Sequence, residues 1–435
     1  MNKLWETMEG KDSHANGNSS AKFQDEMEKG RYCDPFETSL VPSTSNLDGP
    51  FMMPLLPVPN ASQSNSKASV ILTGTATRGG TVPAVGVELW TLVLANLPIF
   101  FKLLCLGSEK ILCKESKALE KGTVCVTGAG GYIGSWLVKL LLSNGYSIHR
   151  TVRDPHDEKN SHLKKLEKAS DKLKLFKVDL LDYNSLSSAI TGCVGVFHVA
   201  SPVPPGSLPD PEMQLIEPAV KGTLKVLKAC SEANVKRVVV VSSGATVSVN
   251  PEWPKGQVKD ETCWSDVEYC RRTNNWYCLS KTKAESEAFE YAKRSGLDVV
   301  RVCPTHVLGP MLQSTANASS LVLIKLSKEG YDEFENNLRM IVDVRDVAEA
   351  LLLAYEKPEA EGRYICTTYM IKSQDLVEIL RKNYPNYNYP KKFTEGKEEE
   401  KLSSEKLQKL GWSYRPIEET LVDSIEICRL AGLLD

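Results

Sequence analysis

The glycine-rich run T-G-A-G-G-Y-I-G at residues 127–134 restricts the fold of this 435-residue chain more than any other feature. It joins a β-branched stretch, which predicts a strand at 123–127, to an amphipathic stretch, which predicts a helix at 132–143. Glycines at this spacing permit a tight turn, let the backbone approach a pyrophosphate and allow the helix to pack closely on the strand. The N–H groups at the start of the helix favour negative charge. The run therefore predicts a dinucleotide-binding site. Its expected cofactor contacts are Gly128, Gly131, Tyr132, Ile133 and Gly134.

The chain after this run alternates short apolar stretches with amphipathic ones. This alternation predicts an α/β fold, a Rossmann-type doubly wound parallel sheet whose strands are almost wholly apolar because helices cover both faces. Further strands are expected at 147–152, 173–178, 195–199, 237–242 and 298–302, and helices at 183–190, 213–233 and 277–294.

The alternation loosens after residue 309, which predicts a smaller, mostly helical C-terminal substrate lobe with one strand near 364–366 returning to the sheet. The expected domains are an N-terminal extension at 1–116, an NADP-binding Rossmann domain at 117–310 and the substrate lobe at 311–435.

The composition argues against several other classes of function. A net charge of −2 provides no basic field for phosphate backbones, so nucleic acid is not expected as a partner. The twelve cysteines form no C-x-x-C pair and no Cys/His cluster, so no metal is predicted, and we expect buried thiols in a reducing compartment. No secretory signal or transit peptide is visible, and we expect a cytoplasmic protein.

The extension at 1–116 is rich in polar and turn-forming residues that bury little surface, and we expect it to be largely disordered. Its apolar stretch at 89–106 approaches the length of a membrane span but is interrupted by Asn96, Pro98 and Lys102. We therefore expect a short helix or a segment without a stable fold. A wrongly joined gene model and a weak membrane anchor are the alternatives.

Arg153 follows the second predicted strand, where an NAD enzyme would place a carboxylate for the ribose 2′-hydroxyl. A guanidinium there suits a 2′-phosphate, and Lys159 adds a second positive charge. NADP(H) is therefore the predicted cofactor. Two observations would argue otherwise: the neighbouring Asp154 favours NAD if its carboxylate turns inward, and Arg153 could be a solvated loop residue.

The ends of the third and fourth predicted strands lie at the carboxyl edge of the sheet, where ligands of such folds bind. Asp179 is placed to accept a hydrogen bond from the adenine amino group, and the alternative is a turn aspartate that caps the next segment. The contacts expected from these two strand ends are Asp179, Leu180, Ala200 and Ser201. His198 is expected to be a packed core residue rather than a base.

Tyr277 and Lys281 lie four residues apart on a predicted helix, so both side chains point the same way. A neighbouring ammonium favours the tyrosine phenolate and lowers its pKa, which makes the tyrosine a usable proton carrier near neutral pH. Ser243, at the end of the fifth strand, is the candidate donor that polarises a carbonyl oxygen. These three residues predict reduction of a carbonyl, with Tyr277 as the general acid.

These segments resemble the extended short-chain dehydrogenases/reductases of plants, specifically the cinnamoyl-CoA reductases and dihydroflavonol reductases. The resemblance covers about 123–434. Its motifs are the glycine run, V-R-D-P from Val152, F-H-V-A-S-P from Phe197, D-E-T-C-W-S-D from Asp260, N-W-Y-C-L-S-K from Asn275 and L-G-P from Leu308.

The resemblance implies an NADPH-dependent reductase of phenylpropanoid type, acting on a small-molecule carbonyl substrate. It implies Ser243, Tyr277 and Lys281 as the catalytic residues and further cofactor contacts at Tyr277, Lys281, Pro304 and Val307. An inactive NADP-binding regulator would lack the tyrosine or the lysine. A sugar-nucleotide dehydratase would carry an acid beside the catalytic hydroxyl, which Ser242 and Gly244 do not supply.

Several positions depart from these families. Cinnamoyl-CoA reductases read N-W-Y-C-Y-G-K where this chain has Leu279 and Ser280, and they carry a histidine and an arginine for the CoA moiety where it has Val322 and Ile371. Lys325 is the one basic residue of that set that this chain keeps. We therefore expect an aromatic or aliphatic aldehyde or ketone as substrate, with a hydroxycinnamoyl-CoA ester as the alternative.

Two further departures concern the pocket. Ser248 replaces the asparagine or aspartate usual in dihydroflavonol reductases, which argues against a flavonoid substrate. His306 replaces an aliphatic residue between the proline and the valine near the nicotinamide. We expect a packed core histidine there, and the alternative is a pocket residue that alters selectivity.

Removal of residues 1–116 tests whether the extension belongs to the enzyme. The truncated chain is expected to keep its solubility and its reductase activity, because the glycine run and every candidate site residue lie after residue 116. Soluble yield and NADPH consumption of the two forms are to be compared. An insoluble or inactive truncated form beside an active full chain would make the extension part of the enzyme.

Overall fold

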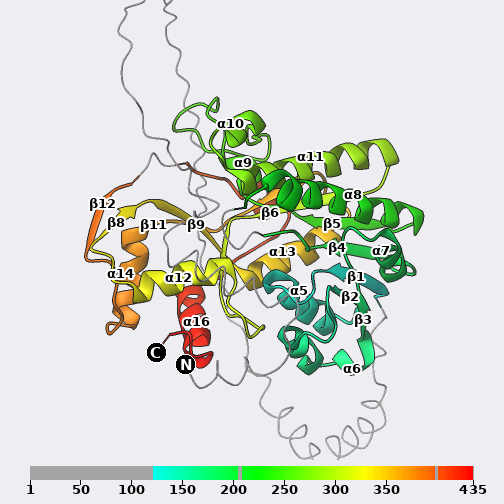
Figure 1. Cartoon of the computed structure of the whole chain (residues 1–435), viewed down its shortest axis with the longest axis horizontal. Helices are drawn as coiled ribbons and strands as arrows, with labels where there is room; N and C mark the ends of the chain where they lie inside the picture. The colour runs from blue at the N-terminus through cyan, green and yellow to red at the C-terminus, as the bar shows by residue number, and fades with distance from the viewer. Residues whose placement is uncertain (1–120, 204–207, 397–399, 435) are drawn as a thin grey trace, which may run out of the picture. The chain divides into compact units, whose positions relative to one another are not determined.

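The computed structural model describes residues 121–203, 208–396 and 400–434 (Figure 1). The predicted extension at 1–116 and its apolar stretch at 89–106 lie outside the described residues. Among the helices of the described part, none is both long enough and apolar enough to span a bilayer.

A seven-stranded sheet forms the centre of the fold, in the order β10-β6-β5-β4-β1-β2-β3. Every adjacent pair in it is parallel. Its strands are β1 (Thr123–Thr127), β2 (Ser147–Val152), β3 (Leu173–Lys177), β4 (Gly195–His198), β5 (Arg237–Val241), β6 (Val299–Pro304) and β10 (Arg363–Cys366). The strand order reverses between β1 and β4, which creates a ligand-binding crevice at the carboxyl edge. The predicted doubly wound parallel sheet is confirmed.

Helices cover both faces of this sheet. On one face α5 (Tyr132–Ser143) packs against α13 (Val344–Glu356), and on the other α8 (Glu217–Glu232) packs between α7 (Tyr183–Ile190) and α11 (Trp276–Ser295) (Figure 1). Strand side chains alternate between the two cores. In β1, for example, Val124 and Val126 join the first core and Cys125 joins the second. Two buried faces explain why the central strands β5 (R-V-V-V-V) and β6 (V-V-R-V-C-P) are mostly apolar, whereas β2 and the edge strand β3 carry more polar residues.

The connections carry further short helices. They are η1 (Glu158–Lys165), α6 (Ala169–Lys172), the π-helical turn η2 (Glu212–Ile216), α9 (Ala245–Ser248) and α10 (Val267–Arg272).

The segment after residue 309 holds more strand than the sequence pattern indicated. Three strands, β11-β9-β7, form a second sheet, and β12-β8 form a two-stranded one. The strands are β7 (His306–Leu308), β8 (Glu333–Asn336), β9 (Leu338–Asp343), β11 (Tyr369–Lys372) and β12 (Lys392–Glu395). The helices are α12 (Ala318–Lys328), α14 (Ser373–Asn383), α15 (Glu405–Lys409) and α16 (Ile417–Leu430). Strands this short, several of them charged, show too little alternation to be predicted. The domain boundaries at 116 and 310 stay a prediction.

Candidate active site

The glycine loop turns at Gly128, which has a φ of +66°. A Cβ added there would lie 2.8 Å from Ala200 Cα, so the turn needs glycine for both its conformation and its close approach to the end of β4. The Thr127 hydroxyl oxygen accepts the N–H groups of Val199 and Ala200 at 3.1 and 3.2 Å. These contacts bring the predicted residues Ala200 and Ser201 beside the glycine loop.

Helix α5 begins at Tyr132 with no side chain capping its N-terminus, where Gly131 is the exposed N-cap residue. Open N–H groups and the helix dipole at that point suit a pyrophosphate. The side chain of Tyr132 is buried, and its hydroxyl donates to the Gly309 carbonyl at 2.7 Å. We infer that the loop fits a dinucleotide and that Tyr132, Ile133 and Gly134 would offer backbone rather than side-chain contacts.

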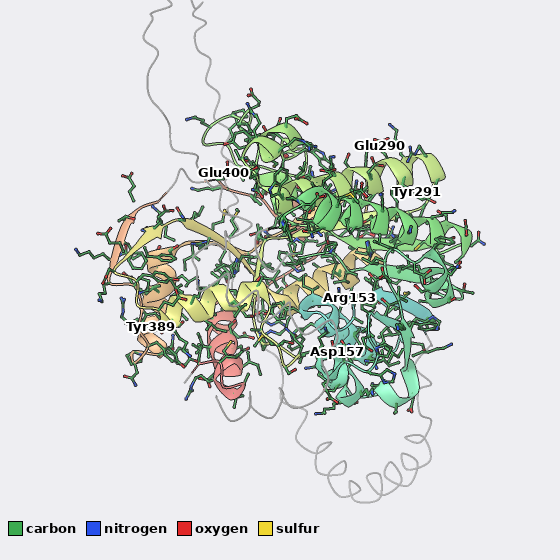
Figure 2. The ribbon with its side chains drawn as sticks, in the orientation of Figure 1. Arg153, Asp157, Glu290, Tyr291, Tyr389 and Glu400 are labelled. Carbon is green, nitrogen blue, oxygen red and sulfur yellow. The ribbon has the colours of Figure 1, made fainter. Side chains whose placement is uncertain are left out.

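The end of β2 presents the two positive charges expected for a 2′-phosphate. Arg153 and Lys159 are both exposed, and the Lys159 ammonium lies 2.5 Å from the Asp157 carboxylate (Figure 2). The Asp154 carboxylate accepts the N–H of His156 at 2.9 Å. One oxygen of the Asp154 carboxylate is therefore engaged in its own turn.

Asp179 also serves its own turn, because its carboxylate accepts the Leu181 N–H at 2.7 Å. It is exposed just beyond β3, while the neighbouring Leu180 packs where a Cβ on Gly222 would lie 3.2 Å away. The turn role expected as the alternative is thus present, and contact with adenine stays a prediction.

His198 is a packed residue, as the sequence predicted. Its ring nitrogens lie 2.9 Å from the Thr127 hydroxyl and 3.2 Å from that of Thr223. Burial, with a smaller contribution from the charge of Lys281, lowers the pKa of His198 to about 3. The imidazole is therefore neutral at physiological pH.

Two contacts bring α11 against the end of β5. The Lys281 ammonium donates to the Val241 carbonyl at 3.2 Å, and the Cys278 thiol donates to the Ala245 carbonyl at 2.9 Å. Val241 and Ala245 each lie two residues from Ser243, which is buried. Lys281 is thereby held at the carboxyl edge of the sheet near Ser243, and Tyr277, one turn earlier on the same helix, is partly buried.

Lys281 is 7% exposed, and this burial lowers its pKa to about 8, with the negative charge of Glu285 acting in the opposite direction. Below pH 8 the side chain carries its proton, and as the pH rises through 8 the positive charge is lost. An ammonium stabilises a nearby phenolate. Lys281 can supply such an ammonium near neutral pH, because its pKa of about 8 keeps it protonated there.

The sequence analysis missed a buried carboxylate one helical turn beyond Lys281. The Ser242 hydroxyl donates to Glu285 at 2.5 Å, and the guanidinium of Arg363 on β10 lies 2.8 Å from the same carboxylate. Arg363 also donates to the Thr246 hydroxyl at 2.6 Å. The recurrence of Tyr277, Lys281 and Glu285 every four residues was the available signal, because it places all three on one helix face.

The Sγ atoms of Cys270 and Cys278 lie 3.1 Å apart, and both side chains are free thiols in a buried setting. Cys278 is the residue after Tyr277. The two thiols help to fix the start of α11 against α10.

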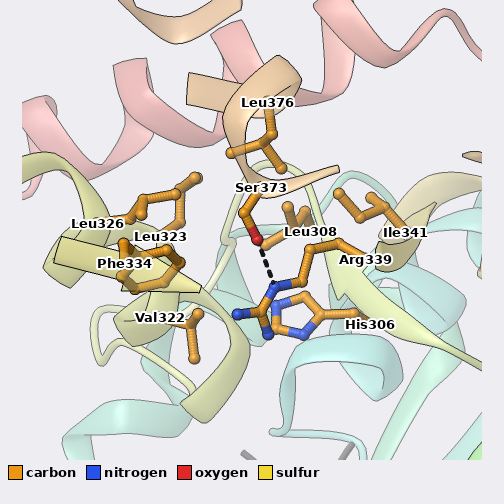
Figure 3. A pocket seen from close by; sticks show the side chains of 10 residues that line it. All are labelled: His306, Leu308, Val322, Leu323, Leu326, Phe334, Arg339, Ile341, Ser373 and Leu376. Carbon is orange, nitrogen blue, oxygen red and sulfur yellow. Dashed lines mark hydrogen bonds between the residues drawn. The ribbon is translucent and has the colours of Figure 1, made fainter. Parts of the chain in front are cut away.

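A pocket opens among β7, β9, α12 and α14 (Figure 3). Its lining residues are His306, Leu308, Val322, Leu323, Leu326, Phe334, Arg339, Ile341, Ser373 and Leu376. His306 is partly buried at this wall, so it is the pocket residue that we gave as the alternative. Arg339 was not identified from the sequence.

The three positions compared with a CoA-binding set are distributed around this pocket. Val322 lines it, whereas Ile371 lies on β11 directly opposite Arg339 in the antiparallel ladder. The Lys325 ammonium lies 3.5 Å from the Glu329 carboxylate.

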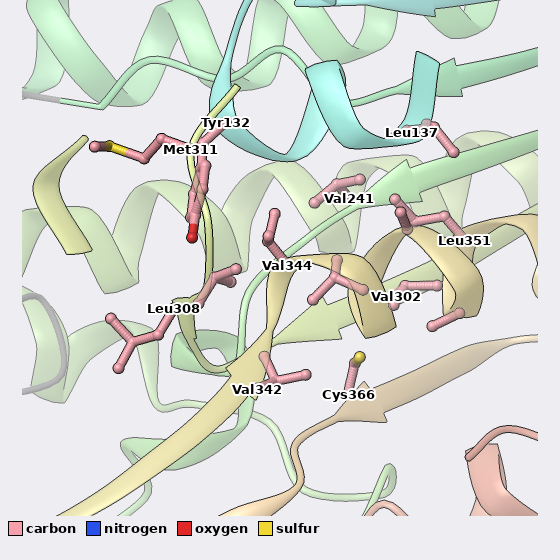
Figure 4. Close-up of a cluster of buried hydrophobic side chains, with 14 of the residues drawn as sticks. Tyr132, Leu137, Val241, Val302, Leu308, Met311, Val342, Val344, Leu351 and Cys366 are labelled. Carbon is pink, nitrogen blue, oxygen red and sulfur yellow. The ribbon is translucent and has the colours of Figure 1, made fainter. Parts of the chain in front are cut away.

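The floor of the pocket continues into the large core of the fold. Leu308 belongs to both, and Met311 and Val344 lie with it and with the buried Tyr132 in that core (Figure 4). The pocket wall is therefore anchored to the cofactor-binding helix α5.

Comparison with known proteins places this arrangement among related enzymes. A family model described as the NAD dependent epimerase/dehydratase family matches residues 124–367. Cinnamoyl-CoA reductase 1 of Petunia hybrida is 47% identical over 322 residues, which cover 73% of this chain and 95% of that protein. A putative anthocyanidin reductase of Ginkgo biloba is 44% identical over 331 residues, covering 72% and 96%.

Solved structures of reductases are also similar. Vestitone reductase from alfalfa has a TM-score of 0.63 at 34% identity and covers 72% of this chain and 100% of its own. A yeast methylglyoxal/isovaleraldehyde reductase complexed with NADPH has a TM-score of 0.63 at 29% identity, covering 71% and 99%.

Glu285→Gln is expected to lower the free energy of unfolding by about 3–5 kcal/mol, because it leaves the Arg363 guanidinium buried without its counter-charge. Denaturant unfolding measures this change. The matched control is Glu290→Gln, an exposed glutamate on the same helix, which is expected to have little effect (Figure 2). Adding Arg363→Met to Glu285→Gln should recover part of the loss. If Glu285→Gln and Glu290→Gln had equal free energies of unfolding, the ion pair between Glu285 and Arg363 would not be important for stability.

Proposed function

We propose that this chain, which belongs to the NAD dependent epimerase/dehydratase family, is an NADPH-dependent reductase that converts an aldehyde or ketone into an alcohol. The observation that carries the proposal is the contact of the buried Lys281 ammonium with the Val241 carbonyl, two residues before Ser243. It joins the helix of Tyr277 to the strand end that faces the predicted nicotinamide site. A small-molecule carbonyl is the proposed partner, not nucleic acid, and the proposed location is the cytoplasm.

When bound, NADPH supplies a hydride to the carbonyl carbon. The Ser243 hydroxyl donates a hydrogen bond to the carbonyl oxygen and stabilises the negative charge that develops there. The Tyr277 hydroxyl transfers its proton to that oxygen, so that one hydride and one proton give the alcohol. The Lys281 ammonium stabilises the resulting phenolate until a proton from solvent restores it.

The proposed cofactor preference rests on Arg153 and Lys159 beyond β2. Both side chains are exposed at the strand end, and Asp154 is engaged by the His156 N–H. The yeast reductase described above is complexed with NADPH, which agrees with this preference. The other proposed contacts are Asp179, Leu180, Ala200, Ser201, Pro304 and Val307.

The proposed substrates are aromatic or aliphatic aldehydes and ketones. The relatives are named as cinnamoyl-CoA, anthocyanidin and vestitone reductases, and a hydroxycinnamoyl-CoA ester is the second candidate. Val322 in the pocket and Ile371 beside it carry no charge, so Arg339 is the one arginine in the pocket lining, fewer positive charges than the several phosphates of CoA favour. A free carbonyl compound is therefore the preferred class.

Tyr277→Phe is expected to lower kcat by about 10²- to 10⁴-fold while leaving cofactor binding unchanged, because only the proton donor is lost. NADPH consumption and fluorescence titration of NADPH measure the two quantities. Tyr291→Phe is the control, because Tyr291 lies on the same helix as Tyr277 but its hydroxyl donates to Ser231 on α8, and it is expected to be dispensable for turnover. Near wild-type turnover of Tyr277→Phe would exclude the mechanism.

Arg153→Ala is expected to reduce the ratio of kcat/KM for NADPH to that for NADH by about tenfold or more, because one charge-assisted bond to the 2′-phosphate is removed. Steady-state kinetics with both cofactors measures the ratio. Arg294→Ala, an exposed arginine at the end of α11, should leave it unchanged. A ratio near one in the unmodified enzyme would refute the NADPH preference.

A further inference from the structure

Three consecutive residues at the end of β5 hold groups of the proposed active site. The Val241 carbonyl accepts a hydrogen bond from the Lys281 ammonium at 3.2 Å. The Ser242 hydroxyl, on the next residue, donates to the Glu285 carboxylate at 2.5 Å. Ser243 follows, and its hydroxyl is the proposed donor to the carbonyl oxygen of the substrate. One strand end therefore fixes the ammonium and the carboxylate beside the proposed donor.

Lys281 and Glu285 lie one helical turn apart on α11, so both side chains project from the same face of that helix. Both are buried, and opposite charges act on each other more strongly where water is excluded. The bond described for the Lys281 ammonium is the one to the Val241 carbonyl. Glu285 therefore acts on Lys281 through its charge and not through a direct bond.

The other groups around Lys281 and Glu285 supply no second negative charge near neutral pH. From the described elements around them come Tyr277 on α11, His198 on β4, Cys303 and Arg301 on β6 and Arg363 on β10. Burial raises the pKa of Cys303 to about 11, so its thiol is neutral, as is the His198 imidazole. Charged residues of α8 and η2, which also pack on α11, pair elsewhere: Lys221 with Glu217, Lys225 with the Leu181 carbonyl, Lys228 with Glu232, and Glu212 with Lys283.

We infer that Glu285 is a positioning residue for the reduction, whose charge keeps Lys281 protonated and so sets the pH above which activity falls. This pH is called the alkaline limit below. The inference rests on the proposed function, because it concerns the proton transfer from Tyr277. The Arg363 guanidinium, 2.8 Å from the carboxylate, and the Ser242 hydroxyl keep Glu285 ionised at this place. The ion pair thus has a role in the reaction as well as in stability.

Two substitutions separate the charge of Glu285 from its shape. Glu285→Gln keeps the size of the side chain and removes the charge, whereas Glu285→Asp keeps the charge. The pH dependence of kcat/KM is measured with NADPH and benzaldehyde as the probe substrate. Without the carboxylate, Lys281 loses its proton at lower pH, so we expect the alkaline limit of Glu285→Gln to fall by about one pH unit or more. Glu285→Asp should keep the wild-type limit.

A double variant controls for the stability that Glu285→Gln is expected to lose. Glu285→Gln combined with Arg363→Met removes both charges of the pair, so no unpaired guanidinium remains buried. Its alkaline limit should also fall by about one pH unit or more, because the carboxylate is still absent. Glu290→Gln, the exposed glutamate on the same helix, should leave the limit unchanged. An unchanged limit in the double variant, or equal shifts in Glu285→Asp and Glu285→Gln, would overturn the inference.

A direct titration of Lys281 separates the inference from catalysis. Tyr277 and Lys281 titrate as a pair in the activity profile, whereas NMR of the full-length enzyme labelled with ¹³C at the lysine Cε atoms follows Lys281 itself. Its signal is assigned by its loss in Lys281→Arg. A titration midpoint about one pH unit or more lower in the double variant than in the wild type supports the inference even where benzaldehyde is not reduced. Absent turnover then counts against the proposed function alone, and equal midpoints overturn the inference.

Discussion

The carboxyl edge of the sheet is organised around one buried charge, the carboxylate of Glu285. It is 2% exposed and is held by the Ser242 hydroxyl and by Arg363, whose guanidinium lies 3.9 Å from the centre of the Trp264 ring. A carboxylate removed from water is tolerated only where such partners are fixed around it. Ser242 directly follows β5, Arg363 lies on β10 and the carboxylate itself belongs to α11. The relative positions of these three elements are therefore fixed together. The same contacts also fix the position of the backbone at Ser243 and of the helix face that carries Lys281.

Burial then decides which groups near the proposed carbonyl site carry charge. The imidazole of His198 is driven neutral, with its pKa lowered to about 3, whereas Lys281 keeps a pKa of about 8 because Glu285 offsets part of the cost of burial. Of these two groups, only Lys281 therefore carries a positive charge near neutral pH. An ammonium near a phenol stabilises its phenolate, which is the condition that the proposed proton transfer from Tyr277 requires.

The helices and strands of the predicted cofactor-binding part were predictable from local sequence, because each of them is defined by consecutive residues. The predicted strand at 147–152 and helix at 183–190 coincide with β2 and α7: β2 is preceded by the turn residues Asn144 and Gly145, and Asp182 caps the start of α7. The later strands are short, and some of them carry charged residues. β8, for example, is the four-residue E-F-E-N, in which two glutamates flank a single phenylalanine and no apolar run indicates a strand. Glu285 and Arg363 were missed for a different reason: they are 78 residues apart, and isolated charged residues are normally expected at the surface.

The residues proposed for catalysis and the residues that line the pocket come from different elements of the fold. Ser243, Tyr277 and Lys281 lie at the end of β5 and on α11, whereas Arg339 lines the pocket from β9. Side chains on β9 and α12 can therefore change without disturbing the Glu285 network, because none of them contacts its carboxylate among the bonds described for it. A catalytic motif read from sequence consequently constrains the reaction much more tightly than it constrains the substrate. The pocket is assembled from segments more than sixty residues apart, from His306 on β7 to Leu376 on α14, so no contiguous motif in the sequence reveals its lining.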